Sequence, residues 1–257
     1  MIKTEVVQQN FSRFPAEYDM CAETQKKCAK KLSTLIKGEF STTSPSQILE
    51  IGCGTGFLTN YLIKEFSDSS FIITDLSNSM LNFCKKKITK EYQNSTLKFT
   101  TLNATTPIPY NNIDLITSSL AFQWIENIEE LFKSANSALS KNGRLIFSTL
   151  LTGTFNEIKM IFNKHQVNFP MPHLLLEKDI HKAAKNANFS EITFKTATYT
   201  ETHSDIKNFL DHIHKVGAGN ATGTPISIPQ LRKIIKSEKV TKNIKAEYIV
   251  LFAILKK

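Results

Sequence analysis

The run LEIGCGTGF at residues 49–57 is the feature that most constrains the fold. An apolar stretch ends at Ile51, glycines stand at positions 52, 54 and 56, and a helix-forming segment starts at once. Glycine lets the backbone turn sharply and lets a ligand approach without meeting a Cβ atom. A helix that begins there directs its unpaired N–H groups and the positive end of its dipole into the turn. The run therefore predicts a ligand-binding turn between a buried strand and a helix.

Short apolar runs alternate with helical patterns around this turn. The pattern predicts strands at 47–51, 71–75, 97–102, 113–119 and 144–150, and helices at 17–35, 57–66, 78–91 and 126–140. We expect KNG at 141–143 to end the last helix, with Gly143 in the left-handed conformation. Such alternation is typical of βαβ units and predicts an α/β protein with a mostly parallel, doubly wound sheet.

The pattern changes in the second half of the chain. Residues 155–187 and 204–238 are predicted to be helical, and the segment between them, 191–200, is strand-like. Residues 246–255 predict a last strand. The simplest arrangement is one α/β domain with helices inserted late, as a lid over the carboxyl ends of the strands.

Composition excludes several classes of protein. The chain has 257 residues, of which 41% are hydrophobic, enough for one sizeable core. Residues 1–10 are polar and show no signal peptide, and the apolar run 248–255 is too short to cross a bilayer. The four cysteines form no C-x-x-C pair, which indicates reduced thiols and no metal cluster. We therefore expect a cytoplasmic protein that does not contact a membrane.

The formal net charge is +9, yet only three of the 32 basic residues are arginines. Proteins that read nucleic acids depend on arginine forks, so this composition argues against a nucleic-acid partner. Two interpretations remain open at this point. The lysines are either a solvated surface or the attraction for an acidic macromolecular partner.

An acid follows the second predicted strand. Asp75 ends FIITD, 19 residues beyond Gly56, and a carboxylate there can accept both ribose hydroxyls of an adenosine. The alternative role, capping the next helix, can be filled by Ser77 or Asn78. The dinucleotide fingerprint is G-x-G-x-x-G, whereas this chain has G-x-G-x-G with Glu50 two residues before it.

That pattern resembles the first motif of the class I S-adenosylmethionine-dependent methyltransferases. The resemblance implies a Rossmann-like fold, S-adenosylmethionine as cofactor, S-adenosylhomocysteine as product and no metal. DLSNSML at 75–81 is similar to the D-x-S-x-x-M-L run of many such enzymes, with Met80 against the adenine. Asn103 stands where these enzymes usually carry an acid, and its amide oxygen can still accept from the adenine amino group. The cofactor contacts implied are Glu50, Gly52, Gly54, Gly56, Asp75, Leu76, Met80, Asn103, Ala104 and Leu120.

The residues after the fourth strand face the methyl group in this fold. Enzymes that methylate base amines resemble one another in N-P-P-Y-like residues there, whereas this chain has SSLAFQW at 118–124. Blocks at 10–19, 120–127, 147–158, 214–224 and 248–257 resemble the malonyl-acyl carrier protein O-methyltransferases of biotin synthesis. The resemblance implies O-methylation of the free malonyl carboxylate on acyl carrier protein, an early step of biotin (pimeloyl) synthesis. It also implies that the acidic partner of the positively charged surface is acyl carrier protein.

Two other interpretations stay open. One is a small-molecule carboxylate methyltransferase of the trans-aconitate type. The other is a non-catalytic S-adenosylmethionine-binding or RNA-associated protein. The resemblance implies a single methyltransferase domain over 1–257, with cap helices at 1–40, a cofactor-binding core at 45–152, lid helices and a strand at 153–240, and a C-terminal antiparallel strand at 245–257.

A carboxylate with a pKa near ~4 is ionised at pH 7, so the reaction needs no general base. The catalytic candidates are therefore residues that align the acceptor. The Tyr18 hydroxyl can donate to a substrate oxygen, the Gln123 amide can orient a carboxylate, and Trp124 can wall the pocket. We favour a shaping role for Gln123 and Trp124 over direct contact. Arg13 and Lys215 are interpreted as solvated side chains.

Overall fold

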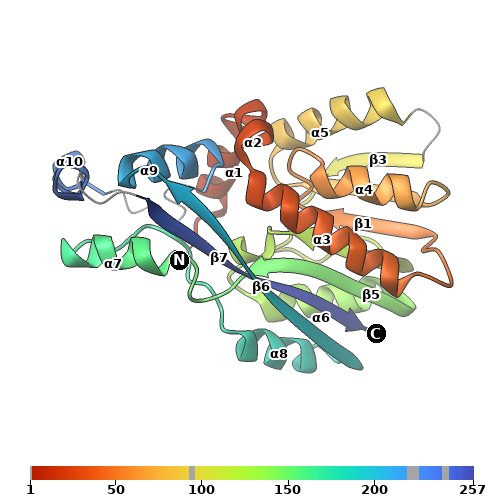
Figure 1. Cartoon of the computed structure of the whole chain (residues 1–257). Coiled ribbons are helices and arrows are strands. Elements are labelled where there is room, and N and C mark those ends of the chain that lie inside the picture. The colour runs from red at the N-terminus through yellow and green to blue at the C-terminus, as the bar shows by residue number, and fades with distance from the viewer. Residues whose placement is uncertain (1, 93–95, 219–225, 239–242) are drawn as a thin grey trace.

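The computed structural model describes residues 2–92, 96–218, 226–238 and 243–257, and its strands form one sheet (Figure 1). The strand order is β3-β2-β1-β4-β5-β7-β6. Strands β1 to β5 pair in parallel, and β7 is antiparallel to both β5 and β6. The predicted sheet, mostly parallel with a C-terminal antiparallel strand, is confirmed. The strands are β1 Gln47–Ile51, β2 Ser70–Asp75, β3 Thr96–Thr101, β4 Ile113–Ser119, β5 Leu139–Leu150, β6 Glu191–His203 and β7 Ile244–Lys256.

Helices cover both faces of the sheet (Figure 1). Successive side chains of a strand point to opposite faces. Ile48 of β1 packs in the cluster with α3, α4 and α5, whereas Leu49 packs in the cluster with α6 and α8. Burial on both faces explains why these strands are continuous apolar runs. The helices are α1 Thr4–Ser12, α2 Pro15–Cys21, α3 Glu23–Glu39, α4 Phe57–Glu65, α5 Asn78–Glu91, the short 3-10 helix η1 Phe122–Trp124, α6 Ile128–Ala138, α7 Asn156–Lys164, α8 Glu177–Asn186, α9 Ile206–Lys215 and α10 Ile228–Ser237.

The structure divides the helix predicted at 17–35 into α2 and α3. Pro15 begins α2, where its fixed φ suits the first turn. Ala22 separates the two helices, with a non-helical ψ of 59°. The helical periodicity continues across this residue, so the pattern alone did not indicate the break. Helix α1 lies within the cap helices that the resemblance implies at 1–40, but no periodicity indicates it, because its sequence is polar and its buried residue is Val7.

The predicted role of Gly143 is wrong. Helix α6 ends at Ala138, and β5 begins directly at Leu139. Asn142 takes the left-handed conformation, with φ at 64°, and Gly143 lies inside the strand. A Cβ atom on Gly143 would come within 2.9 Å of the Ile113 carbonyl oxygen. The glycine therefore permits close approach of β5 to β4 at this point.

The segment predicted to be helical at 155–187 contains α7 and α8, separated by non-helical residues 165–176. The segment predicted at 204–238 contains α9 and α10. The strand predicted at 191–200 is part of β6, and the one predicted at 246–255 is part of β7. The sequence block at 214–224 lies mostly outside the described residues. Within the described part of the chain, no helix has the length and apolarity needed to span a bilayer.

Candidate active site

The glycine turn follows β1 and is held by the neighbouring strand. The N–H groups of Gly52 and Cys53 both donate to the carbonyl oxygen of Thr74 at 2.9 Å. All three glycines have positive φ, of +74°, +53° and +88° in order along the chain. A Cβ atom on Gly52 would lie 2.6 Å from the Cβ of Ala121. The turn is therefore pressed against the segment after β4, and a side chain at Gly52 would force the two apart.

Asp75 ends β2 beside this turn. Its Oδ2 accepts from the Gly54 N–H and its Oδ1 from the Ser77 N–H, each at 2.8 Å. Burial raises the pKa of Asp75 to about 6, against the opposing effect of these N–H donors. The Ser77 hydroxyl accepts from the Met80 N–H and so caps α5, which leaves Asp75 free of that role. Each carboxylate oxygen keeps capacity for a second donor.

A hollow of about 830 Å³, measured out to open solvent, lies over the turn and Asp75. Its floor is the carboxyl ends of the strands, which is where ligands bind in open α/β sheets. Helix α1 and Tyr18 lie along its other side. The predicted site residues that line this first hollow are Tyr18, Gly52, Gly54, Asp75, Leu76, Met80, Asn103, Ala104, Leu120 and Trp124.

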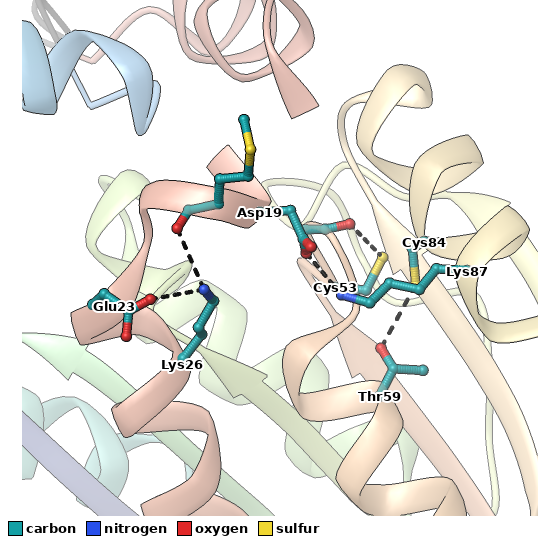
Figure 2. Close-up of polar contacts among 9 residues, drawn as sticks. Asp19, Glu23, Lys26, Cys53, Thr59, Cys84 and Lys87 are labelled. Carbon is teal, nitrogen blue, oxygen red and sulfur yellow. Dashed lines mark hydrogen bonds and ion pairs between the residues drawn. The ribbon is translucent and has the colours of Figure 1, made fainter. Parts of the chain in front are cut away.

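Two predicted cofactor residues lie behind the turn and do not line the hollow. Glu50 is 1% exposed, and its Oε2 accepts from the Thr59 hydroxyl of α4 at 2.6 Å. Burial raises the pKa of Glu50 to about 7. A Cβ atom on Gly56 would come 2.9 Å from the Sγ of Cys84, so the glycine lets α4 approach α5. Figure 2 shows Cys84 beside Thr59, close to the turn. These residues support the turn from the core.

Asn103 faces its own loop. Its side-chain oxygen accepts from the Thr105 N–H at 3.0 Å and from the Thr105 hydroxyl at 2.8 Å. The oxygen predicted to accept from adenine is thus already engaged by Thr105. The neighbouring Ala104 also lines the hollow. Contacts of Asn103 and Ala104 with the adenine both stay predictions.

Helices α1 and α2 cover the first hollow. The Gln8 side chain donates to the Leu76 carbonyl oxygen at 3.0 Å, and the Ser12 and Ser77 hydroxyls are 2.8 Å apart. Asp19 of α2 pairs with Lys87 of α5 at 2.7 Å (Figure 2). The N-terminal helices are therefore fastened to the loop after β2 and to the helix that follows it.

A second hollow of about 640 Å³ adjoins the first. Phe11, Tyr18, Leu120 and Trp124 line both, so they form the boundary between them. Most of its wall is apolar, and the end of β5, the 169–174 segment and α9 each contribute to it. Its polar side chains among the described residues are Tyr18, Gln25, Gln123 and Tyr248.

Leu120 has an unusual backbone at this boundary. Its φ is 52°, in the left-handed region that a leucine rarely adopts. Its N–H donates to the Ser148 carbonyl oxygen at 3.0 Å, which holds the conformation. Such strained residues often occur at functional sites. Here the conformation directs the chain from β4 into η1, along the wall of both hollows.

Gln123 lines the second hollow but not the first. Its amide nitrogen donates to the Leu120 carbonyl oxygen at 2.5 Å, and its amide oxygen accepts from the Thr149 hydroxyl at 3.3 Å. Trp124 packs edge-on against Phe11, with ring centroids 5.5 Å apart. Both side chains thus hold the turn after β4, an arrangement that supports the predicted shaping role without testing it.

Tyr18 stands between the two hollows. Its ring stacks on Phe57 of α4, with centroids 6.0 Å apart and planes at 19°. Burial holds the pKa of Tyr18 well above its usual range, so the hydroxyl keeps its proton. No described residue hydrogen-bonds this hydroxyl, which makes it available as a donor to a substrate. Arg13 and Lys215 are exposed and line neither hollow.

Sequence reasoning missed several residues of the site. Gln8 and Phe11 belong to α1, which no pattern predicted as a helix, although Phe11 falls in the block at 10–19. Gln25 and Tyr248 reach the second hollow from α3 and β7. Their positions in helical and strand patterns gave no signal of a pocket. Among the described residues, no group of three or more His, Cys, Asp or Glu side chains is placed to hold a metal ion.

Comparison with known proteins agrees with this geometry. Residues 49–145 match the family described as a methyltransferase domain. The solved structure of the YcgJ protein from Bacillus subtilis is similar with a TM-score of 0.65, at 13% identity, and the match covers 89% of this chain and 98% of that one. The fold and the glycine turn are therefore those of the class I methyltransferases, and residues 49–145 are similar to a methyltransferase domain.

Relatives of known name indicate which group of methyltransferases the chain resembles. The malonyl-[acyl-carrier protein] O-methyltransferase of Bacillus cereus is 29% identical over 227 residues, which cover 86% of this chain and 83% of that protein. The enzyme of the same name from Neorickettsia risticii is 27% identical over 237 residues, covering 91% and 90%. The chain thus resembles the malonyl-acyl carrier protein O-methyltransferases over most of its length, and the resemblance that the sequence blocks indicated is confirmed.

Proposed function

We propose that the chain transfers a methyl group to the free carboxylate of a malonyl thioester on acyl carrier protein, giving the methyl ester for biotin (pimeloyl) synthesis. The observation that carries the proposal is the meeting of two hollows at Tyr18, Leu120 and Trp124. The first has the glycine turn and Asp75 for an adenosyl cofactor, and the second is a mostly apolar chamber for an acceptor. The name shared by the relatives supplies the identity of the acceptor.

The residues of the first hollow fit S-adenosylmethionine. The glycines leave the turn open to a ligand, since a Cβ atom at Gly52 would clash with Ala121, and the Asp75 carboxylate has capacity for two ribose hydroxyls. In this proposal Ala104 and Asn103 lie at the adenine edge, with Leu76 and Met80 along its faces. Glu50 and Gly56 act from behind, by fixing the turn to α4 and α5.

The bound cofactor supplies a sulfonium methyl that an oxygen nucleophile takes by displacement, which leaves S-adenosylhomocysteine. The acceptor would be a malonyl carboxylate, which is already ionised at pH 7, so the chain need not supply a general base. The chain has three tasks. The apolar wall excludes water, Trp124 and Leu120 limit the approach, and the Tyr18 hydroxyl donates to the carboxylate oxygen that does not react.

The basic surface suits an acidic carrier. Arg13 follows α1, and Lys215 ends the helix whose Ile213 lines the second hollow, and both are exposed. Long-range attraction raises association rates and falls as salt rises. In this proposal Arg13→Glu with Lys215→Glu lowers kcat/KM for malonyl-acyl carrier protein about tenfold at low salt. The rate with malonyl-pantetheine, which has no carrier surface, stays unchanged; equal losses with both would contradict steering.

The acceptor is tested by methyl transfer from labelled S-adenosylmethionine to malonyl-acyl carrier protein, malonyl-CoA, trans-aconitate and RNA. The proposal expects base-labile methyl ester on the malonyl thioesters, fastest on the carrier. Transfer to trans-aconitate alone would indicate the small-molecule class. Transfer to RNA alone, or cofactor binding with no transfer to any of the four, would contradict the proposal as well.

A further inference from the structure

Gln25 of α3 lines the second hollow, and its side chain carries an unpaired acceptor. Its amide oxygen is buried, and no described residue hydrogen-bonds it. Much of the surrounding wall is apolar, with Phe155, Phe169 and Ile213 among its residues. A buried carbonyl oxygen without a donor destabilises the folded state, and such groups in native proteins call for an explanation. A bound ligand with an N–H group in this hollow would supply the missing donor.

The other amide of the same hollow is already used. Gln123 donates to the Leu120 carbonyl oxygen and accepts from the Thr149 hydroxyl, so both ends of its side chain have partners within the chain. Gln25 has no corresponding partner for its oxygen. Of the two, Gln25 is therefore the amide with hydrogen-bonding capacity left for a ligand.

Thr24, the residue before Gln25, is held by a partly buried acid, Glu201. Thr24 is 1% exposed, and its hydroxyl donates to the Oε1 of Glu201 on β6 at 2.5 Å. The Tyr248 hydroxyl of β7 donates to the Oε2 of the same carboxylate at 3.2 Å. Glu201 thus joins α3 to β7, and Gln25 and Tyr248 both line the hollow.

The same carboxylate also joins α9. The Nε2 of His212 is 3.0 Å from the Oε2 of Glu201, and that of His203 is 3.7 Å away. His212 directly precedes Ile213, another residue of the hollow. One partly buried carboxylate therefore connects three walls of the second hollow from outside it, and it holds Thr24, the neighbour of Gln25.

An acceptor that carries its malonyl group on a pantetheine thioester has an amide N–H three atoms beyond the sulfur. Free dicarboxylates, once ionised, have no hydrogen to donate. We propose that Gln25 accepts this pantetheine amide N–H and so selects thioester-borne acceptors, and that Glu201 is the positioning residue that holds Gln25 in place. This inference rests on the proposed function and specifies how its acceptor is recognised.

Two small acceptors isolate the contribution of the amide N–H to binding. The malonyl thioester of N-acetylcysteamine keeps this group, and malonyl ethyl thioester lacks it. Gln25→Leu is expected to raise KM about tenfold for the first, the worth of one buried hydrogen bond, and to leave KM for the second unchanged. Binding of S-adenosylhomocysteine, measured by calorimetry, should stay as in the wild type. The control is Gln9→Leu, which alters an exposed glutamine of α1.

Glu201→Gln should also reduce the preference for the amide-bearing thioester, with KM for S-adenosylmethionine unchanged. A merely structural role would instead weaken both thioesters alike and lower the melting temperature without changing their ratio. Equal KM values of wild type and Gln25→Leu for the N-acetylcysteamine thioester would overturn the inference and leave the proposed function standing. No methylation of either thioester by the wild type, with normal cofactor binding, would overturn the proposed function itself.

Discussion

Asp75 is a buried acid whose oxygens already accept N–H groups from the turn that it supports. Desolvation raises its pKa, and the N–H donors limit the rise, so the carboxyl titrates at about pH 6. The position of Asp75 was predictable, because the prediction required only the end of the second strand and its spacing from the glycine turn. The hydrogen bonds to Gly54 and Ser77 were not, since they depend on how two loops meet.

Cofactor affinity should therefore depend on pH. Ribose hydroxyls donate to the ionised form of Asp75, which is lost as the pH falls through about 6. We expect the Kd of S-adenosylhomocysteine to be lowest above pH 7 and to rise as the pH falls through about 6, by about tenfold in all. Calorimetry on the wild type and Asp75→Asn measures this. The variant should bind about tenfold more weakly at pH 7.5 and lose most of the acid-side dependence. The same pH dependence of the Kd in the wild type and in Asp75→Asn would contradict its assignment to Asp75.

Gly52 fixes the distance between the turn and the segment after β4. Gly52→Ala places a Cβ atom 2.6 Å from that of Ala121, at a φ of +74°. We expect a loss of about 1–3 kcal/mol in the free energy of unfolding and of most cofactor affinity. Gly38→Ala in α3 is the matched control, because nothing lies within 4 Å of its added Cβ. It should stabilise by about 0.5–1 kcal/mol. Urea unfolding of both variants measures the difference, and equal effects would exclude the steric explanation.

At the scale of elements, α2 is the helix that connects the two hollows. Tyr18 stacks on Phe57, Lys87 lies over the same ring at 5.0 Å, and Asp19 pairs with Lys87. An ion pair with both side chains about a third exposed contributes less than about 1 kcal/mol to global stability. Its effect should instead be local, on how long the N-terminal helices stay closed over the cofactor.

Asp19→Asn tests this local effect. We expect S-adenosylhomocysteine to dissociate about two- to fivefold faster, because one ion pair that is about a third exposed contributes only a small free energy. The melting temperature should change little. Stopped-flow displacement gives the dissociation rate. Asp211→Asn is the control, since the Lys207–Asp211 pair lies within α9 and joins no two elements. Equal acceleration by the two variants would indicate a general charge effect.

At the scale of the whole molecule, Glu201 joins elements that are distant in sequence. Its carboxylate contacts Thr24, His203, His212 and Tyr248. Burial alone would raise the pKa of Glu201, but the imidazoles and the Thr24 hydroxyl outweigh it and hold the pKa well below its usual range. A carboxyl with a depressed folded pKa stabilises the protein above the unfolded pKa near ~4.3 and loses that contribution as the pH falls further.

Glu201→Gln should therefore lower the free energy of unfolding by about 2 kcal/mol at pH 7, through lost charge-assisted hydrogen bonds. The difference from the wild type should shrink below about pH 4, where the wild-type carboxyl is increasingly protonated. Urea unfolding at pH 7, 5 and 3.5 measures it. A difference that does not change over this range would mean that packing, not charge, determines the loss.

Most of the core sheet could be predicted because its signals are local. The strands at 47–51 and 113–119 and the helix at 78–91 have the predicted bounds. The errors fall where tertiary contacts override a local pattern. Ala22 interrupts a continuous helical periodicity, and Gly143 serves an approach between β4 and β5 that no local signal records.

The sequence by itself determined the fold class, the glycine turn, Asp75 and the relatives of the chain, because each depends on residues close together along it. Only the tertiary structure decided what faces each hollow. It placed Glu50 behind the turn and bonded the Gln123 amide to the Leu120 carbonyl oxygen. It also brought Gln25, Ile213 and Tyr248 into one wall. A pocket forms from residues far apart in sequence, and their directions follow from packing that no periodicity encodes.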